Sequence, residues 1–122
     1  MGEKILIVDD DAKNRKLLRT VLQNYGYEVT EAEDGTEGIR IANENIPHIV
    51  LMDIQMPVMD GIEAMKTLKS APETSSIPVI ALTSYAMRGD HERFLLEGFD
   101  GYICKPIDID KTLKVVRTHT CR

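Results

Sequence analysis

The fold of this chain is constrained most by an alternation, repeated five times, between a short strand-like segment and a stretch in which apolar residues have helical spacing. The expected strands cover residues 4–8, 27–32, a run ending at Asp53, 77–82 and 102–104. Strands that alternate with helices pair in parallel through right-handed crossovers, and the helices cover both faces of the sheet. The pattern therefore predicts one doubly wound α/β domain.

The expected helices are recognised by their apolar residues and by the residues at their ends. Gly26 and Gly98 are expected to end the first and the fourth, and Asp108 is expected to cap the last. The helical stretches carry Leu17, Leu18, Val21, Leu22 and Tyr25; Ile39, Ile41 and Ala42; Ile62, Met65 and Leu68; residues 90–97; and Ile109, Leu113 and Val116.

Side chains that can do chemistry stand where these strands end. Asp9 and Asp10 follow the first strand, Asp53 ends the central one, and Thr83 and Lys105 follow the fourth and the fifth. The carboxyl ends of parallel strands lie at one edge of the sheet, which is where open α/β sheets bind their ligands. The sequence therefore predicts a site built from three carboxylates, a hydroxyl and an amine.

Composition narrows the class of function. The 122 residues (13.7 kDa) suffice for one domain with its own core, and the net charge of -5 argues against a nucleic-acid partner. No apolar run reaches the ~20 residues of a membrane-spanning helix, so no membrane partner is expected. The amino terminus has no signal-peptide pattern. Cys104 and Cys121 are expected to stay reduced thiols, which favours a cytoplasmic location.

Four segments in a fixed order identify a family resemblance. They are ILIVDD at 5–10, LMDIQMPVMDG at 51–61, IALT at 80–83 and YICKP at 102–106. Together they resemble the receiver domain of two-component response regulators over the whole chain. The resemblance implies a flavodoxin-like (βα)5 fold with strand order 2-1-3-4-5. Residues 1–122 are expected to form a single receiver domain without an effector domain, most similar to single-domain regulators and hybrid-kinase receivers.

The resemblance implies phosphoryl transfer from a phosphohistidine to a carboxylate of this chain. Asp53 would be the nucleophile that becomes an aspartyl phosphate. Lys105 would pair with one phosphoryl oxygen, and Thr83 would donate a hydrogen bond to another. Catalysis would then rest on positioning and charge stabilisation, and no external substrate would be turned over, so the chain is not expected to be an enzyme.

The resemblance also implies a magnesium ion. Asp9, Asp10 and Asp53 carry -3 and Lys105 carries +1, and one divalent ion would neutralise the remaining -2. Asp10 and Asp53 would ligate Mg²⁺ directly, Asp9 mostly through water, and the backbone carbonyl of Gln55 would complete the protein share. Mn²⁺ is expected to substitute.

Each of these residues has an ordinary structural interpretation when it is taken alone. Asp9 and Asp10 could begin a helix, Asp53 could form an ion pair with Lys105, and Thr83 could be a turn hydroxyl. Because the motifs occur together and in order, the site interpretation is preferred. Asp11, which follows the pair, is expected to cap a helix rather than to bind the metal.

A switch and a docking surface follow from the resemblance. Phosphorylation would draw Thr83 toward the phosphoryl group while Tyr102 swings inward, and the surface around helix 4, strand 5 and helix 5 would then bind a downstream protein target. The Lys105–Pro106 bond is usually cis in the family. The phosphodonor would be a histidine kinase or a histidine phosphotransfer domain, contacted by Lys13, Asn14, Leu17, Pro106 and Ile107.

Two further expectations concern residues near these motifs. Gln55 and Tyr85 would flank the path of an attacking water, and a bulky Tyr85 would shield the acyl phosphate and slow self-dephosphorylation. Phe94, Leu95 and Leu96 are consecutive on a helix and cannot all face the core, so one or two should be exposed near Tyr102. Such residues suit a partner or dimer surface, or simply the edge of the sheet.

The residues also bear on three other functions. A flavodoxin-like electron carrier needs a phosphate-cradling loop after the first strand, where Asp9, Asp10 and Asp11 carry the wrong charge. A phosphohydrolase with an Asp nucleophile usually has a second Asp two residues on, where this chain has Gln55. A receiver acting as a binding module without phosphorylation stays open.

Overall fold

A computed structural model describes residues 2–56, 59–84 and 90–120, with the side chains of 90 and 91 excepted. Five parallel strands form one sheet in the order β2-β1-β3-β4-β5, which confirms the predicted doubly wound fold. The elements are β1 (Lys4–Val8), α1 (Ala12–Asn24), β2 (Glu28–Ala32), α2 (Gly35–Asn45), β3 (Ile49–Asp53), α3 (Gly61–Ser70), β4 (Val79–Thr83), α4 (Asp90–Glu97), β5 (Gly101–Cys104) and α5 (Ile109–Thr120).

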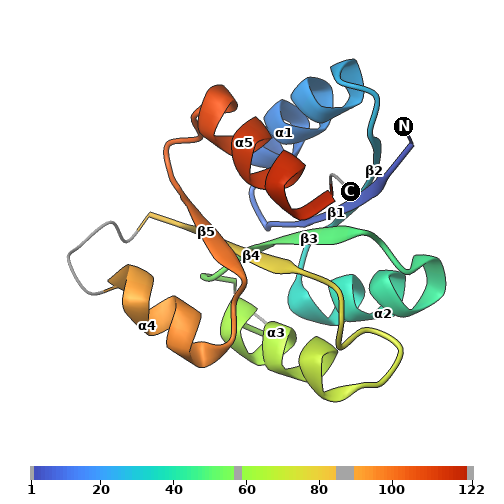
Figure 1. Cartoon of the computed structure of the whole chain (residues 1–122), viewed down its shortest axis with the longest axis vertical. Helices are drawn as coiled ribbons and strands as arrows, with labels where there is room; N and C mark the ends of the chain where they lie inside the picture. The colour runs from blue at the N-terminus through green and yellow to red at the C-terminus, as the bar shows by residue number, and fades with distance from the viewer. Residues whose placement is uncertain (1, 57–58, 85–89, 121–122) are drawn as a thin grey trace.

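The helices form one layer on each face of the sheet. Figure 1 shows α1 and α5 together on one face and α2, α3 and α4 on the other. The strand side chains alternate between these layers, since Leu6 and Val8 pack with α2, α3 and α4 whereas Ile5 and Ile7 pack with α1 and α5. This period of two is the geometry of an extended strand. It gives the domain two apolar cores, one on each side of the sheet.

Burial distinguishes the central strands from the edge. β3 and β4 are buried along their whole length, whereas β2 alternates between exposed and partly buried residues until Ala32. A strand covered on both faces must be apolar throughout, which explains the continuous apolar runs in the sequence. The central strands therefore deliver Asp53 and Thr83 from well-packed positions.

The first strand and the end of the third lie where they were predicted, and several of the other strand bounds differ by one or two residues. The fourth strand begins at Val79 rather than at 77, because the Ile77 amide still donates to the Thr74 carbonyl at 3.1 Å and Pro78 has no N–H. The second strand begins at Glu28 rather than at 27, and the fifth at Gly101 rather than at 102.

Aspartates begin several of the helices. Asp11 accepts the Lys13 amide at 2.9 Å, which confirms it as the cap of α1, and Asp108 accepts the Lys111 amide at 3.0 Å at the start of α5. A carboxylate at this position satisfies an amide that has no partner within the helix. Within the described ranges, no helix is both long and apolar enough to span a bilayer.

Candidate functional site

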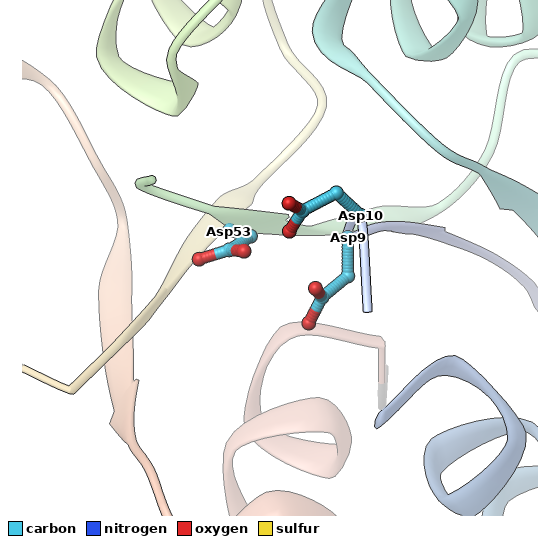
Figure 2. Close-up of side chains that lie close together, drawn as sticks. All are labelled: Asp9, Asp10 and Asp53. Carbon is cyan, nitrogen blue, oxygen red and sulfur yellow. The ribbon is translucent and has the colours of Figure 1, made fainter. Parts of the chain in front are cut away.

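The residues predicted to form the site come from the carboxyl ends of neighbouring strands. Asp9 and Asp10 directly follow β1, and Asp53 is the last residue of the adjacent strand β3. Figure 2 shows the side chains of Asp9, Asp10 and Asp53 close together, with the carboxylate of Asp10 extending toward Asp53. One ligand oxygen from each of the three carboxylates lies within 4.8 Å of the others.

Burial makes this acidic cluster electrostatically costly. Asp9 has no exposed surface and Asp53 is 4% exposed, whereas Asp10 is exposed at the rim. Oδ1 of Asp9 accepts the Asp11 amide at 2.9 Å, but among the described residues its Oδ2 accepts no hydrogen bond. A buried carboxylate oxygen that accepts no hydrogen bond is rare, and although Nζ of Lys105 lies 3.4 Å away, a cation or a water molecule would complete its surroundings.

Lys105 supplies the positive charge of the site. Its Nζ lies 3.3 Å from Oδ1 of Asp53 and 3.4 Å from Oδ2 of Asp9. Its amide donates to the Thr83 carbonyl at 2.7 Å, and the Lys105–Pro106 bond is cis, as expected. One ammonium therefore faces both buried carboxylates from the end of β5.

The pKa of Asp53 reflects the excess of negative charge in the site. Burial, followed by the negative charge of Asp9, raises this pKa from 3.8 to about 7, although Lys105 acts in the opposite direction. Desolvation and a like charge both favour the protonated carboxyl. The lysine alone therefore does not neutralise the cluster, and a second cation would be well accommodated.

The donor set fits a hard divalent cation. Mg²⁺ is bound in proteins by one or two carboxylates together with carbonyl oxygens and water. The cluster offers carboxylate oxygens from Asp9, Asp10 and Asp53, and among the described residues the buried Oδ2 of Asp9 accepts no hydrogen bond. Gln55 lies close, because its amide donates to Oδ1 of Asp53 at 3.3 Å. The role of its carbonyl oxygen as a ligand stays a prediction.

Comparison with known proteins identifies the family to which the chain belongs. The family model described as "Response regulator receiver domain" matches residues 5–117. The polar-differentiation response regulator DivK of Brucella anthropi is 39% identical over 119 residues, covering 98% of this chain and 97% of its own length. The chain belongs to the response-regulator receiver family.

Solved structures agree with this assignment. A putative response regulator from Chloroflexus aurantiacus has a TM-score of 0.93 and 28% identity, with each chain covered completely. The receiver domain of the sensor histidine kinase PA1611 from Pseudomonas aeruginosa has a TM-score of 0.90 and 30% identity over 100% of both chains. That structure holds a magnesium ion coordinated in its active-site cleft. Receiver domains are signalling modules in which an aspartate accepts a phosphoryl group from a histidine kinase or phosphotransfer protein.

The receiver's two predicted switch residues lie on neighbouring strands. Thr83 ends β4 directly after Leu82, the register partner of Asp53, and is 2% exposed. Tyr102, on β5, is the register partner of Ala81 on β4. Its partly buried side chain packs against the core that α2, α3 and α4 cover. Their places are compatible with the predicted switch, whose movement stays a prediction.

The predicted docking residues lie on α1 and in the segment between β5 and α5. Leu17 is 40% exposed on α1, and Lys13 and Pro106 are exposed as well. Asn14 and Ile107 are partly buried. The first three can be reached by a partner without any rearrangement, which is a necessary condition for docking.

Other expectations have mixed outcomes. Phe94 is buried, whereas Leu95 is 49% and Leu96 is 88% exposed, so the prediction that one or two of these residues face solvent is confirmed. Tyr85 and Cys121 lie outside the described residues. The expected effects of Tyr85 on phosphoryl lifetime therefore stay predictions.

Sequence reasoning missed two residues that shape the site. Gly61 donates its amide to the Ile54 carbonyl at 2.9 Å, and a Cβ there would lie 2.1 Å from the Asp53 carbonyl oxygen. Gly61 was recognised as part of the motif at 51–61 and as the approximate start of a helix, but nothing in the motif indicated this close contact. Arg15 donates to the Asp9 carbonyl at 2.6 Å, and nothing in its helical pattern distinguished it from a solvated arginine.

Proposed function

We propose that this receiver accepts a phosphoryl group on Asp53 in a magnesium-dependent reaction and then presents an altered surface to a downstream protein. The observation that carries the proposal is the group of charges around Asp53, which is 4% exposed. Its Oδ1 lies 3.3 Å from Nζ of Lys105, and oxygens of two further carboxylates lie within 4.8 Å of a carboxylate oxygen of Asp53. A structural ion pair would need one carboxylate for one lysine, not three.

The transfer step uses groups of this chain at defined positions. A carboxylate oxygen of Asp53 forms a bond to phosphorus while the phosphorus–nitrogen bond of the phosphohistidine breaks, and the electron pair leaves with the imidazole nitrogen. Lys105 offsets charge on the phosphoryl oxygens, and the Thr83 hydroxyl donates a hydrogen bond to one of them. Their places at the ends of β3, β4 and β5 support these roles.

The metal site is assigned to four residues. Asp10 and Asp53 bind Mg²⁺ directly, Asp9 acts mostly through water, and Gln55 contributes its backbone carbonyl. When bound, the ion supplies charge compensation for both the acidic cluster and the phosphoryl oxygens. The raised pKa of Asp53 and the Asp9 oxygen that accepts no hydrogen bond support a cation here, and Mn²⁺ is expected to substitute.

The output surface is assigned to the face formed by α4, β5 and α5. A cavity of about 780 Å³ lies on this face, and Tyr102 and Lys105 both contribute to its lining. A change of Tyr102 on phosphorylation of Asp53 would therefore alter the wall of a cavity that is large enough to receive a partner side chain. Its other lining residues include Leu95, Lys111, Lys114 and His119.

The phosphodonor is assigned to a histidine kinase or a histidine phosphotransfer domain that docks beside the site. Lys13, Asn14 and Leu17 on α1, with Pro106 and Ile107 after β5, form the proposed docking surface. Such a partner would act in the cytoplasm, and the chain would turn over no external substrate. The residues from 1 to 122 would act as one receiver domain.

The deciding experiment is intact mass spectrometry after incubation with acetyl phosphate. With Mg²⁺ we expect one phosphoryl adduct that is labile to base, and we expect none with excess EDTA or in the Asp53→Asn variant. Circular dichroism of both proteins would verify the fold. A folded wild-type chain that takes up no phosphoryl group would make a binding module that acts without phosphorylation the better function.

A further inference from the structure

We propose that Arg15 is a positioning residue for the metal site, holding the peptide bond between Asp9 and Asp10 in the orientation that metal binding requires. The inference rests on the function proposed above and extends it to a residue outside the acidic cluster. Arg15 reaches this peptide from α1 and donates Nη1–H to the Asp9 carbonyl oxygen at 2.6 Å.

The guanidinium of Arg15 is itself held in place. Its Nε donates to Oε1 of Glu31 at 3.2 Å, and its Nη2 lies 3.7 Å from Oε1 of Glu33. The side chain is only 12% exposed, so this is an ordered contact and not a solvated charge. The planar fork of an arginine can bind two groups at once in fixed directions, whereas a lysine cannot. Arg15 thus links the end of β1 to the edge strand β2.

Asp9 is held through each of its polar groups. Its amide donates to the Ala32 carbonyl at 3.1 Å, its Oδ1 accepts the Asp11 amide, and its Oδ2 faces Lys105. The remaining group is the carbonyl, which Arg15 holds. That carbonyl belongs to the same planar peptide as the Asp10 nitrogen, so fixing it also fixes the direction in which the Asp10 side chain leaves the backbone.

Asp10 needs this support because it has little of its own. Its side chain is exposed, and among the described residues it makes no hydrogen bond or ion pair within the protein. Residues that orient a metal ligand typically change metal affinity by 10- to 100-fold when they are removed. Arg15 is the residue in a position to orient Asp10 through the backbone.

Charge and positioning predict opposite results for the removal of Arg15. Taking away a positive charge near an acidic cluster should tighten the binding of a divalent cation. Taking away the hydrogen bond that orients Asp10 should weaken it. Arg19 provides the matched control, because it pairs with the same Glu31 and, within the described chain, makes no hydrogen bond to Asp9.

The experiment measures Mg²⁺ affinity by calorimetric titration of the unphosphorylated 122-residue chain. We expect Arg15→Met to raise the dissociation constant about tenfold, and Arg19→Met to leave it unchanged or lower it. Saturating Mg²⁺ should then restore the phosphorylation of Arg15→Met by acetyl phosphate. An affinity of Arg15→Met equal to or tighter than that of the wild type would overturn the inference.

Two safeguards keep the result interpretable. If Arg15→Met does not fold by circular dichroism, Arg15→Lys and Arg19→Lys, which keep the charge, replace the pair. Weaker Mg²⁺ binding in the first but not in the second would support positioning, and equal affinities would contradict it. If the wild-type chain itself binds no Mg²⁺, the proposed function fails, independently of any arginine variant.

Discussion

Nζ of Lys105 lies 3.3 Å from Oδ1 of Asp53, yet the pKa of Asp53 is raised to about 7. Burial and the neighbouring Asp9 outweigh the attraction of the lysine. The folded protein therefore holds unfavourable negative charge at this strand edge, which a proton, a substitution or a divalent cation can relieve.

Replacing Asp53 by Asn should stabilise the metal-free protein at neutral pH. Because the pKa of Asp53 is higher in the folded state, its stabilising contribution is complete below about pH 4 and is lost as the pH rises through about 7. The free energy of unfolding of the wild type should therefore fall relative to Asp53→Asn between pH 5 and pH 8. Allowing for solvent screening at the mouth of the site, we expect the unfolding free energy of Asp53→Asn to exceed that of the wild type by about 2 kcal/mol at neutral pH.

Urea unfolding in EDTA at pH 5, 6.5 and 8 measures this difference. Glu73→Gln is the control, because it removes a carboxylate from an exposed loop position. Its unfolding free energy should follow that of the wild type at every pH. An Asp53→Asn variant whose stability also runs parallel to that of the wild type would show that Asp53 carries no unfavourable charge.

Magnesium should remove most of the advantage of Asp53→Asn. A ligand that binds only the folded state stabilises it by about 1.4 kcal/mol at ten times its dissociation constant. The wild type should gain this amount with Mg²⁺ at pH 8, whereas Asp53→Asn, which lacks one ligand charge, should gain less. Thermal unfolding with Mg²⁺, with Ca²⁺ and with EDTA checks the prediction, and equal gains in both proteins would place the ion away from Asp53.

The strands, and the site residues at their ends, could be predicted from the sequence because hydrophobic periodicity specifies where a strand lies and where it ends. Runs such as residues 49–52 are apolar throughout because helices cover both faces of the sheet, so these strands, and the sheet edge where they end, could be inferred from the sequence. Asp9, Asp53 and Lys105 were found because they end such runs. The strand order, by contrast, came from the family resemblance, since alternation alone is compatible with several orders.

Tertiary contacts between residues of different elements could not be predicted from periodicity. Arg15 has the helical position of a solvated residue, and only the packing of β2 beside α1 brings Glu31 to it. Gly61 was recognised as the last residue of the motif at 51–61, but its close approach to the Asp53 carbonyl depends on how the start of α3 lies against the end of β3. Neither relationship leaves a periodic signal in the sequence.

Thr112→Val should stabilise the protein. The Thr112 side chain is buried at 1% exposure on α5, and among the described residues its hydroxyl has no hydrogen-bond partner. Valine has nearly the same shape and a similar helix propensity, so removing the hydroxyl relieves a desolvation cost of about 1 kcal/mol. Chemical denaturation measures the gain.

The matched control is a buried threonine whose hydroxyl is bonded. The Thr74 hydroxyl donates to the Leu68 carbonyl at 2.6 Å and is fully buried. Thr74→Val should therefore lose about 1–2 kcal/mol. If both variants shift stability in the same direction, hydrogen bonding is not what separates the two sites.

Gly61→Ala should damage both stability and the site. The added Cβ would lie 2.1 Å from the Asp53 carbonyl oxygen. Because the Cβ is fixed rigidly to one backbone segment and the oxygen belongs to another, the end of β3 or the start of α3 has to move. We expect a loss above about 3 kcal/mol, together with weaker Mg²⁺ binding in whatever fraction stays folded. Gly26→Ala is the comparison: at its φ of +91° nothing lies within 4 Å of the new Cβ, so it should cost only about 1–2 kcal/mol and leave Mg²⁺ affinity intact.

Leu17→Ser should slow phosphorylation by a protein donor more than phosphorylation by a small molecule. Leu17 is 40% exposed at the proposed docking surface, and an apolar side chain that a partner removes from water contributes to affinity in proportion to the apolar area buried. We expect the ratio between the rate with a phosphorylated histidine phosphotransfer domain and the rate with acetyl phosphate to fall about tenfold. Leu96→Ser is the control, because Leu96 is 88% exposed on α4, outside the proposed docking residues. Phosphotransfer followed by intact mass in both variants decides the matter: equal ratios would move the donor's docking surface away from α1.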